Sequence, residues 1–294
     1  MAIVTTGFFD GVHSGHRKVI DTLVATARSR GEHSVVVTFW PHPRNVLRQD
    51  ARQLRLLNSL QEKKERLLGC GVDRIEVVDF TRDLSRLSCE QFIREYLMSA
   101  LGASAVVAGY DHRLGNPQYS TDVAAVARSL GLEAIRTTSL SDSYNTISST
   151  YIRNLLSTGG IERANRLLGY SYTLSGVVVS GNGIGHSLNY PTANMQLYEP
   201  LKVIPEQGVY AVKVHVEGGD HCGVCNIGVR PTVSDDRTLV IETHILDFDE
   251  EIYGLDISFD FCYKLRNERK FDSVRMLKDQ LAQDVAQARN LFGI

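Results

Sequence analysis

Net charge is almost absent from this chain of 294 residues, because 32 Lys and Arg stand against 34 Asp and Glu, a formal charge of -2 at pH 7. Proteins that hold nucleic acid or anionic membranes usually carry a broad basic face. We therefore expect small substrates, no nucleic acid and no membrane, with any phosphate held by local groups.

Long apolar runs are also missing. The chain has no stretch of about 18 apolar residues, and the segment MAIVTTGFFDG lacks a charged region followed by a long apolar one. We expect a cytoplasmic protein, and the sequence shows no sign of an obligate protein partner.

Cysteine is scarce and its count is odd. Five cysteines favour reduced thiols over a disulfide framework. Cys222 and Cys225 form one CxxC pair, half of a zinc site, but no second pair stands at metal-ligand spacing. Zinc is therefore not favoured.

The length fits two domains better than one. Residues 2–138 alternate short β-rich runs with helical patterns, which is typical of a doubly wound parallel sheet. The expected strands are AIVTT, SVVVTF, RIEVVDF, SAVVAG and LEAIRTT. Helix boundaries are indicated by the capping-box pairs Ser59 with Glu62 and Ser88 with Gln91, and by Gly31 and Gly131.

The second half has a different pattern. After two short helical patterns, β-rich runs broken by glycine and acidic turns continue to Phe271, where a last helix follows. This pattern predicts a small antiparallel β-barrel closed by a C-terminal helix. We place the domains at 1–170 and 171–294, so the fold class is α/β plus all-β.

The first expected strand leads directly into GFFDGVHSGH, residues 7–16. Open α/β sheets bind ligands at this end of a strand, and a helix start offers N–H groups and a positive dipole end to a phosphate. His13 and His16 can each donate an N–H, and Gly15 permits close approach. The competing interpretation is a turn with two solvated histidines, but the position between strand and helix favours a phosphate site.

A second candidate phosphate site lies at residues 147–153. Ser148, Ser149 and Thr150 stand at an expected helix start, with Arg153 one turn later. Hydroxyl caps and a fixed cation suit an anion, but ordinary helix capping explains these residues equally well. Segments 38–43 and 109–115 also follow strands and face the same crevice.

In the second half, three glycines, Gly181, Gly183 and Gly185, follow a strand and allow the main chain to wrap phosphates. Thr192 and Asn194 provide oxygen ligands of the kind that Mg2+ prefers. A glycine-rich hairpin with a turn at PTAN is the alternative, and the residues alone leave the two interpretations even.

Residues 7–16 resemble the HxGH signature of the nucleotidylyltransferase superfamily, specifically its FAD synthetase branch, and residues 147–153 are similar to its ISSTxIR segment. The resemblance implies that His13 and His16 are catalytic. It implies an ATP site made of Gly7, Phe8, Phe9, Asp10, His13, His16, Ser148, Ser149, Thr150 and Arg153. Residues 41–43 and 109–115 look like its PHP and DFRFG-type segments, with Leu114 in place of an aromatic, and imply flavin contacts from His42, Asp111 and Arg113.

Residues 181–194 resemble the GxxxGRxLGFPTAN region of riboflavin kinases, with His186 and Asn189 in place of arginine and glycine. The resemblance implies that Gly181, Gly183 and Gly185 bind ATP, and that Thr192 and Asn194 hold Mg2+. It further implies that Glu242, in an E-x-H strand, is the general base. Glu242 and Arg266 are then expected to contact the flavin.

Together the motifs look like those of bacterial bifunctional riboflavin kinase/FMN adenylyltransferases, or FAD synthetases. This resemblance implies phosphorylation of riboflavin to FMN by ATP and adenylylation of FMN to FAD with release of pyrophosphate, with Mg2+ as the metal. Three alternatives are a monofunctional adenylyltransferase with a weakened kinase-like barrel, an HxGH enzyme for another phosphorylated substrate, and a binding module without catalysis. The motif residues His13, His16, Thr192, Asn194 and Glu242 argue against the last.

Overall fold

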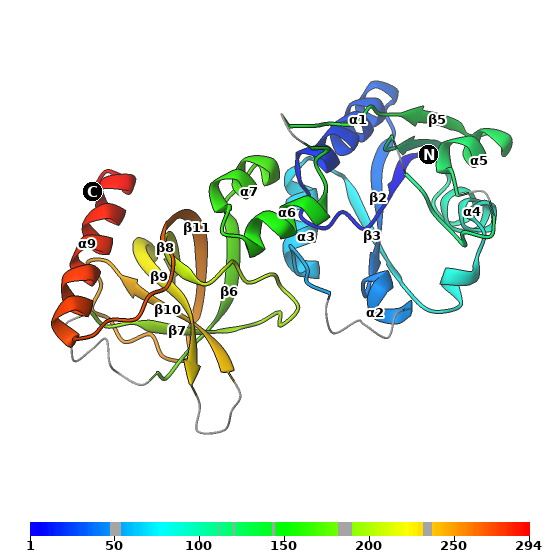
Figure 1. The fold of residues 1–294 in the computed structure, drawn as a ribbon. Helices are drawn as coiled ribbons and strands as arrows, with labels where there is room; N and C mark the ends of the chain where they lie inside the picture. The colour runs from blue at the N-terminus through cyan, green and yellow to red at the C-terminus, as the bar shows by residue number, and fades with distance from the viewer. Residues whose placement is uncertain (48–53, 111, 120, 143–144, 182–189, 232–236) are drawn as a thin grey trace. The chain divides into compact units, whose positions relative to one another are not determined.

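The computed structural model describes residues 1–47, 54–110, 112–119, 121–142, 145–181, 190–231 and 237–294 (Figure 1). The chain divides into two compact units, Met1–Tyr151 and Ile152–Ile294. This division falls earlier than residue 170, because most of α6 (Ser149–Ser157) and all of α7 (Ile161–Leu168) belong to the second unit. None of the helices in the described residues is both long and apolar enough to span a membrane.

The first unit contains a parallel sheet, as the sequence predicts. Its strands lie in the order β3 (Arg74–Asp79), β2 (His33–Trp40), β1 (Ala2–Thr6), β4 (Ala103–Ala108) and β5 (Glu133–Arg136). The chain leaves β1 toward β2 and returns to its other side at β4. A crevice for ligands is expected at the carboxyl ends of β1 and β4, where the strand order reverses.

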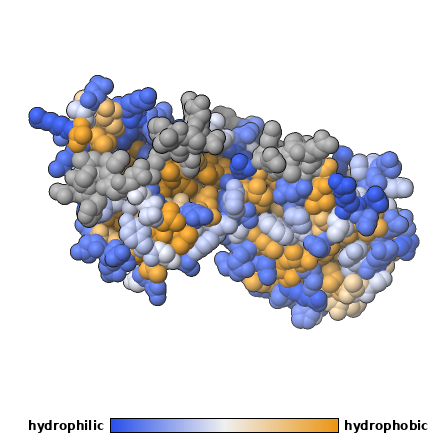
Figure 2. Space-filling model, turned by 90° about the horizontal axis from the view of Figure 1, so that it is seen from below, coloured by the Kyte–Doolittle hydropathy of each residue, from blue (hydrophilic) through white to orange (hydrophobic). Residues whose placement is uncertain are grey.

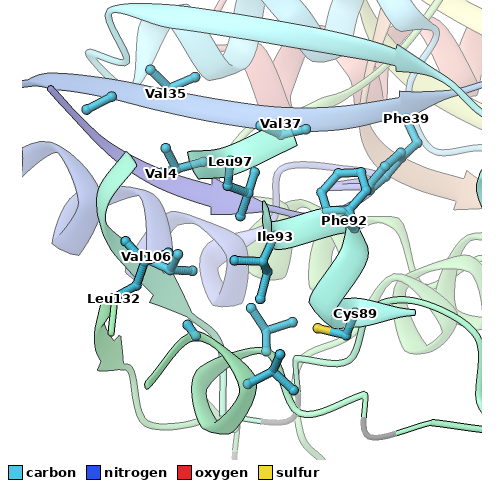
Figure 3. Packing of buried hydrophobic residues seen from close by; sticks show 14 of the residues in the cluster. Val4, Val35, Val37, Phe39, Cys89, Phe92, Ile93, Leu97, Val106 and Leu132 are labelled. Atoms are coloured by element: carbon cyan, nitrogen blue, oxygen red, sulfur yellow. The ribbon is translucent and has the colours of Figure 1, made fainter. Parts of the chain in front are cut away.

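Alternate residues of the central strands point to opposite faces of the sheet. Ile3 packs in the cluster formed with α1 (Ser14–Arg30) and α3 (Leu60–Gly69). Val4 and Val106 pack on the opposite face, against side chains of α4 (Cys89–Phe92) and of the π-helix η3 (Ile93–Ala100), and α5 (Val123–Ser129) completes that layer (Figure 3). Both faces of the sheet are therefore covered, as a doubly wound fold requires.

The helix boundaries confirm most of the expected signals. Ser59 and Ser88 each form a complete capping box, and Gly31 ends α1 in the left-handed conformation with φ 65°. The helix after Ser88 differs from a regular α-helix, because it becomes π-helical after one turn. Two short helices, α2 (Pro43–Leu47) and η2 (Leu84–Arg86), complete the unit.

The second unit contains a closed antiparallel barrel, which confirms the predicted fold class. Its strands are β6 (Tyr172–Val179), β7 (Ala193–Leu197), β8 (Gly208–Val216), β9 (Gly219–Pro231), β10 (Arg237–Ile245) and β11 (Asp256–Arg266). They close in the order β10-β7-β6-β11-β8-β9. The short strand β7 begins inside the PTAN run, where one of the two interpretations of the sequence places a turn.

Two helical segments pack on the barrel. The last helix, α9 (Val274–Phe292), buries Ala288 against Val209 and Ala211 of β8. Helix α7 is held by Asn165, which donates a hydrogen bond to the Phe261 carbonyl at 2.7 Å and accepts one from the Tyr172 amide at 2.8 Å.

On the face drawn in Figure 2, hydrophobic areas are interrupted by hydrophilic ones, as expected for a chain of mixed charge.

Candidate functional sites

The turn between β1 and α1 has an unusual backbone. Phe9 and Val12 adopt positive φ angles of 52° and 38°, with Gly11 between them at 85°. Such angles are costly for residues that carry a β-carbon, most of all for a branched one, and they persist only where surrounding structure holds them. A β-carbon on Gly7 would lie 3.0 Å from the Phe9 ring, so the turn is also tightly closed.

His13 both caps α1 and faces His16. Its Nδ1 accepts a hydrogen bond from the His16 amide at 3.3 Å, and the two rings stack with centroids 3.7 Å apart. Because Nδ1 accepts, the proton of the neutral ring lies on Nε2, from which it can be donated to a phosphate. A β-carbon on Gly15 would lie 3.2 Å from the His13 ring, which gives the physical reason for glycine at this position.

His16 is expected to act as a neutral donor. Its burial is the main reason that its pKa is well below the ordinary value, and electrostatic interactions with His13 and Lys63 lower the pKa further. Its Nδ1 is buried and has no hydrogen-bond partner among the described residues. At neutral pH the ring therefore offers an N–H group more than a positive charge.

Lys63 is a buried cation behind this turn, and the sequence analysis missed it. Its side chain is 1% exposed, and Nζ donates hydrogen bonds to the Phe8 carbonyl at 3.1 Å and to Thr38 Oγ1 at 3.0 Å. Nζ also lies 4.0 Å from the centroid of the Phe8 ring. Burial lowers the pKa of Lys63 to about 8, although the Asp10 charge opposes this. The available signal was its spacing of four residues before the buried Leu67, which places both on one helix face.

Asp10 has structural partners. Its carboxylate accepts hydrogen bonds from the amides of Leu57 and Asn58 at 3.0 and 3.1 Å, and its carbonyl accepts one from Ser149 Oγ at 2.8 Å. Asp10 thus ties two later segments to the turn, and a contact with ATP remains a prediction.

Residues at the start of α6 both cap the helix and line a cavity, so each of the two interpretations of residues 147–153 has structural support. Ser148 Oγ accepts a hydrogen bond from the Tyr151 amide at 3.2 Å, so helix capping is real. Ser148, Ser149 and Thr150 also line a cavity beside the turn. Arg153 lies one helical turn further along α6, beyond the end of the first unit, and its role stays a prediction.

Two cavities open at the ends of the parallel strands. The first, of about 390 Å³, is lined by residues of the turn, including His13 and His16, and by residues 137–140 and 146–150. The second, of about 540 Å³, is mainly apolar, and its walls include Phe39, Phe80, Phe92 and Leu114. Both volumes fall in the range of small-molecule sites. Gly7, Phe8 and His112 line both cavities.

The expected flavin contacts lie near the second cavity. Arg113 and Leu114 are in its wall, and the His42 ring packs edge-on against Phe8 with centroids 4.1 Å apart. Asp111 lies outside the described residues. The apolar wall suits a flat aromatic ring, but the individual contacts stay predictions.

In the barrel, Glu242 lies in a row of polar residues across three strands. The register pairs Glu242 of β10 with Asn194 of β7 on one side and with Asn226 of β9 on the other. His244, two residues on and so on the same face, is 2.9 Å through Nδ1 from the Pro191 carbonyl. Glu242 therefore lies beside the PTAN segment, and its role as general base stays a prediction.

The described part of the glycine-rich segment lies against the same row. A β-carbon on Gly181 would lie 2.2 Å from Nδ2 of Asn194, so the close approach requires glycine. Thr192 lines a cavity of about 330 Å³ together with residues 245 and 248–253. Gly183, Gly185, His186 and Asn189 lie outside the described residues.

Metal binding depends on oxygen donors. Among the described residues, no group of three or more His, Cys, Asp or Glu is arranged to hold a metal ion. The oxygen atoms of Thr192 and Asn194 are of the kind that suits Mg2+, which prefers few protein ligands together with substrate phosphates.

Cys222 is half-buried and Cys225 is buried in β9, and burial raises the pKa of each thiol, to about 12 for Cys225.

Arg266 has a partner within the barrel unit. Its Nε and Nη2 atoms donate to both carboxylate oxygens of Asp284 on α9, at 2.8 to 3.1 Å. Asp284 is 1% exposed and also accepts a hydrogen bond from Gln280 at 2.7 Å. Arg266 therefore anchors α9 to the end of β11, and a flavin contact stays a prediction.

Comparison with known proteins confirms both family resemblances. The family model described as FAD synthetase matches residues 1–151, and the one described as riboflavin kinase matches residues 168–292. The chain is 40% identical to the bifunctional riboflavin kinase/FMN adenylyltransferase of Listeria monocytogenes, over 99% of this chain and 92% of that protein. It is 36% identical to the protein of the same description from Bacillus subtilis, again over 99% and 92%.

A solved structure shows the same fold over the whole chain. It is the crystal structure of a protein from Streptococcus pneumoniae described as a macrolide-efflux protein, with TM-score 0.91, 30% identity, and coverage of 98% of this chain and 94% of that one. Its description names another activity, whereas the two family models and the curated relatives agree with one another and with the motifs. The chain belongs to the family of bifunctional riboflavin kinase/FMN adenylyltransferases.

Proposed function

We propose that the chain phosphorylates riboflavin to FMN in its barrel unit and converts FMN to FAD in its parallel-sheet unit. The observation that supports this most directly is the pair of adjoining cavities in the first unit, one lined by His13 and His16 and the other apolar. Two substrates that must react with each other need such neighbouring sites. We assign residues 1–170 to adenylyl transfer and residues 171–294 to phosphorylation, with residues 152–170, which pack with the barrel unit, as the connecting segment.

In adenylyl transfer, a phosphate oxygen of FMN attacks the α-phosphorus of ATP. The new phosphoanhydride bond forms as the bond to the β-phosphate breaks, and pyrophosphate leaves with its electron pair. Such transfers depend on alignment and on stabilisation of charge, so no covalent enzyme intermediate is needed. The Nε2–H of His13 and the N–H of His16 donate to the phosphate oxygens, while the strained turn fixes both rings.

In phosphorylation, the terminal ribityl hydroxyl of riboflavin attacks the γ-phosphorus of ATP and ADP leaves. Glu242 takes the hydroxyl proton, a role that fits a carboxylate within hydrogen-bond reach. Asn194 and Asn226, paired with Glu242 in register, provide amide groups that orient the carboxylate or the substrate.

We propose Mg2+ as the metal of both reactions, with Thr192 and Asn194 as protein donors in the barrel. When bound, the ion neutralises charge on the phosphate oxygens that receive electrons from the breaking bond. The residues of this chain supply the oxygen donors and the positions of the two substrates.

The test starts from the purified chain with ATP and Mg2+. One reaction receives riboflavin and a parallel one receives FMN, and both products are followed by chromatography over time. We expect FMN and then FAD in the first reaction and FAD in the second. FAD from supplied FMN alone would show that the barrel is not a working kinase, and no product in either reaction would refute both assignments.

A further inference from the structure

His112 occupies the boundary between the two cavities of the first unit. Of the three residues that line both cavities, Gly7 donates its amide to the Val37 carbonyl at 3.0 Å, and the Phe8 carbonyl accepts from Lys63. His112 is the one of the three that presents a polar side chain to the boundary. The imidazole of His112 therefore lies where the two cavities meet.

The position of the ring is set by the central strand. His112 Nε2 lies 3.0 Å from Oγ1 of Thr6, the last residue of β1. Thr6 is 2% exposed, so the contact anchors the ring to the buried edge of the sheet. A ring anchored in this way can contribute to alignment, because alignment requires groups whose own positions are fixed.

The proposed reaction places a phosphate at this boundary. If the adenosine triphosphate lies with the histidines of the first cavity and the flavin ring in the apolar second cavity, the FMN phosphate must reach between them. A phosphate dianion there needs donors, and an imidazole is a suitable one. The DFRFG-type segment that residues 111–115 resemble has an aromatic ring at this position, and the histidine of this chain adds two nitrogen atoms to such a ring.

We propose that the imidazole of His112 contacts the FMN phosphate where the two cavities meet and is thus a further substrate-binding residue of the adenylyl-transfer site. The proposal rests on the function proposed above. Because His112 would contact the phosphate of FMN, its replacement should weaken the binding of FMN and leave both the binding of ATP and the reaction in the barrel unchanged.

The informative variant is His112→Phe, which keeps a ring in the wall and removes the nitrogen atoms. Initial rates of FAD formation are measured against FMN at saturating ATP and against ATP at saturating FMN. Since a hydrogen bond to a charged group is being removed, we expect KM for FMN to rise about tenfold. KM for ATP should change by less than about twofold, and riboflavin phosphorylation should be unchanged.

Two further variants make the result specific. His112→Gln keeps an N–H donor and should lie closer to the wild type in KM for FMN than His112→Phe does. His33→Phe, at an exposed position at the start of β2, is the matched control and should leave both constants unchanged. Folding of the first unit is checked by the emission of Trp40, the single tryptophan.

The outcomes separate this proposal from the proposed function. If the wild type makes no FAD, the proposed function fails and the role of His112 with it. If the wild type makes FAD, an unchanged KM for FMN in His112→Phe would overturn the proposal for His112 alone. Equal rises in both KM values would also overturn it, because they would indicate a general distortion of the site.

Discussion

The two candidate sites are built in opposite ways. In the parallel-sheet unit, His13 and His16 come from one turn, and local contacts such as the bond from the His16 amide to His13 fix them. In the barrel, Glu242 meets Asn194 and Asn226 only through the pairing of three strands. A site made by one turn depends on local backbone geometry, whereas a site made across strands depends on the register of the whole barrel.

The difference predicts how separable the two activities are. Each unit has its own core. Apart from Arg153, the described residues of each candidate site all belong to one unit. Substitutions of side chains in one site should then leave the other activity intact. The following experiments test this separation, beginning with the largest expected effect.

Glu242→Gln should reduce riboflavin phosphorylation by about 10²- to 10⁴-fold, because the amide cannot take the proton of the ribityl hydroxyl. FAD formation from supplied FMN should keep its wild-type rate. Both rates are measured on the same preparation by chromatography. Glu217→Gln, at an exposed turn position of the barrel, is the matched control, and a loss of both activities in Glu242→Gln would refute the one-site-per-unit assignment.

His16→Ala should give the reverse result, with FAD formation lowered about 10²- to 10³-fold and riboflavin phosphorylation unchanged, since one donor to a charged transition state is removed. His33→Ala controls for the loss of an exposed histidine in the same unit. Wild-type FAD formation in His16→Ala would show that the stacked pair does not act on the phosphates.

The sequence predicted the features that depend on local structure and missed those that depend on contacts between distant segments. The capping boxes at Ser59 and Ser88 and the turn at residues 7–16 are local, and the structure confirms the helix starts and the strand-turn-helix setting. The row of Asn194, Glu242 and Asn226 could not be predicted, because no single segment of the sequence determines the register in which β7, β10 and β9 pair. The family resemblance supplied Glu242 itself, and nothing in the sequence indicated Asn226 as its neighbour.

Lys63 and Asp284 were missed for a related reason. Each is a charged residue in a helix rich in polar residues, a pattern that is typical of a solvated face. Their burial depends on what the helix packs against, so the structure alone shows that Lys63 contacts Phe8 and that Asp284 holds Arg266. Replacing either residue should therefore change the stability of one unit and not of the other.

Asp284→Asn should destabilise the barrel unit alone, by about 3 kcal/mol, because it leaves the largely buried guanidinium of Arg266 without its ion-pair partner. Hydrogen exchange followed by mass spectrometry should show faster exchange in β11 and α9 with no change in the parallel-sheet unit. Asp279→Asn, exposed on the same helix, is the matched control. Equal destabilisation of both units would mean that they do not fold independently.

Lys63 should produce a pH dependence that only the parallel-sheet unit shows. Its pKa of about 8 in the folded chain lies below the value of 10.5 for a free lysine, so between these values the unfolded chain binds more protons than the folded one. The free energy of unfolding should therefore rise with pH across that window, by up to about 1.4 kcal/mol per pH unit, relative to Lys63→Met. Trp40 reports this directly, since it is the single tryptophan and its ring lies 5.7 Å from Lys63 Nζ.

The measurement is denaturant unfolding of the wild type and Lys63→Met, followed by Trp40 emission at pH 7.5, 8.5 and 9.5. Lys64→Met removes one positive charge from the same helix but retains Lys63, so this variant should keep the wild-type slope, and loss of the slope in Lys64→Met as well would assign the effect to net charge. A wild-type stability that runs parallel to that of Lys63→Met at all three values would show that Lys63 does not lose its proton in the folded chain in this range. The contact with the Phe8 carbonyl would then stabilise the buried ammonium, and the turn at residues 7–16 would rest on a permanent charge.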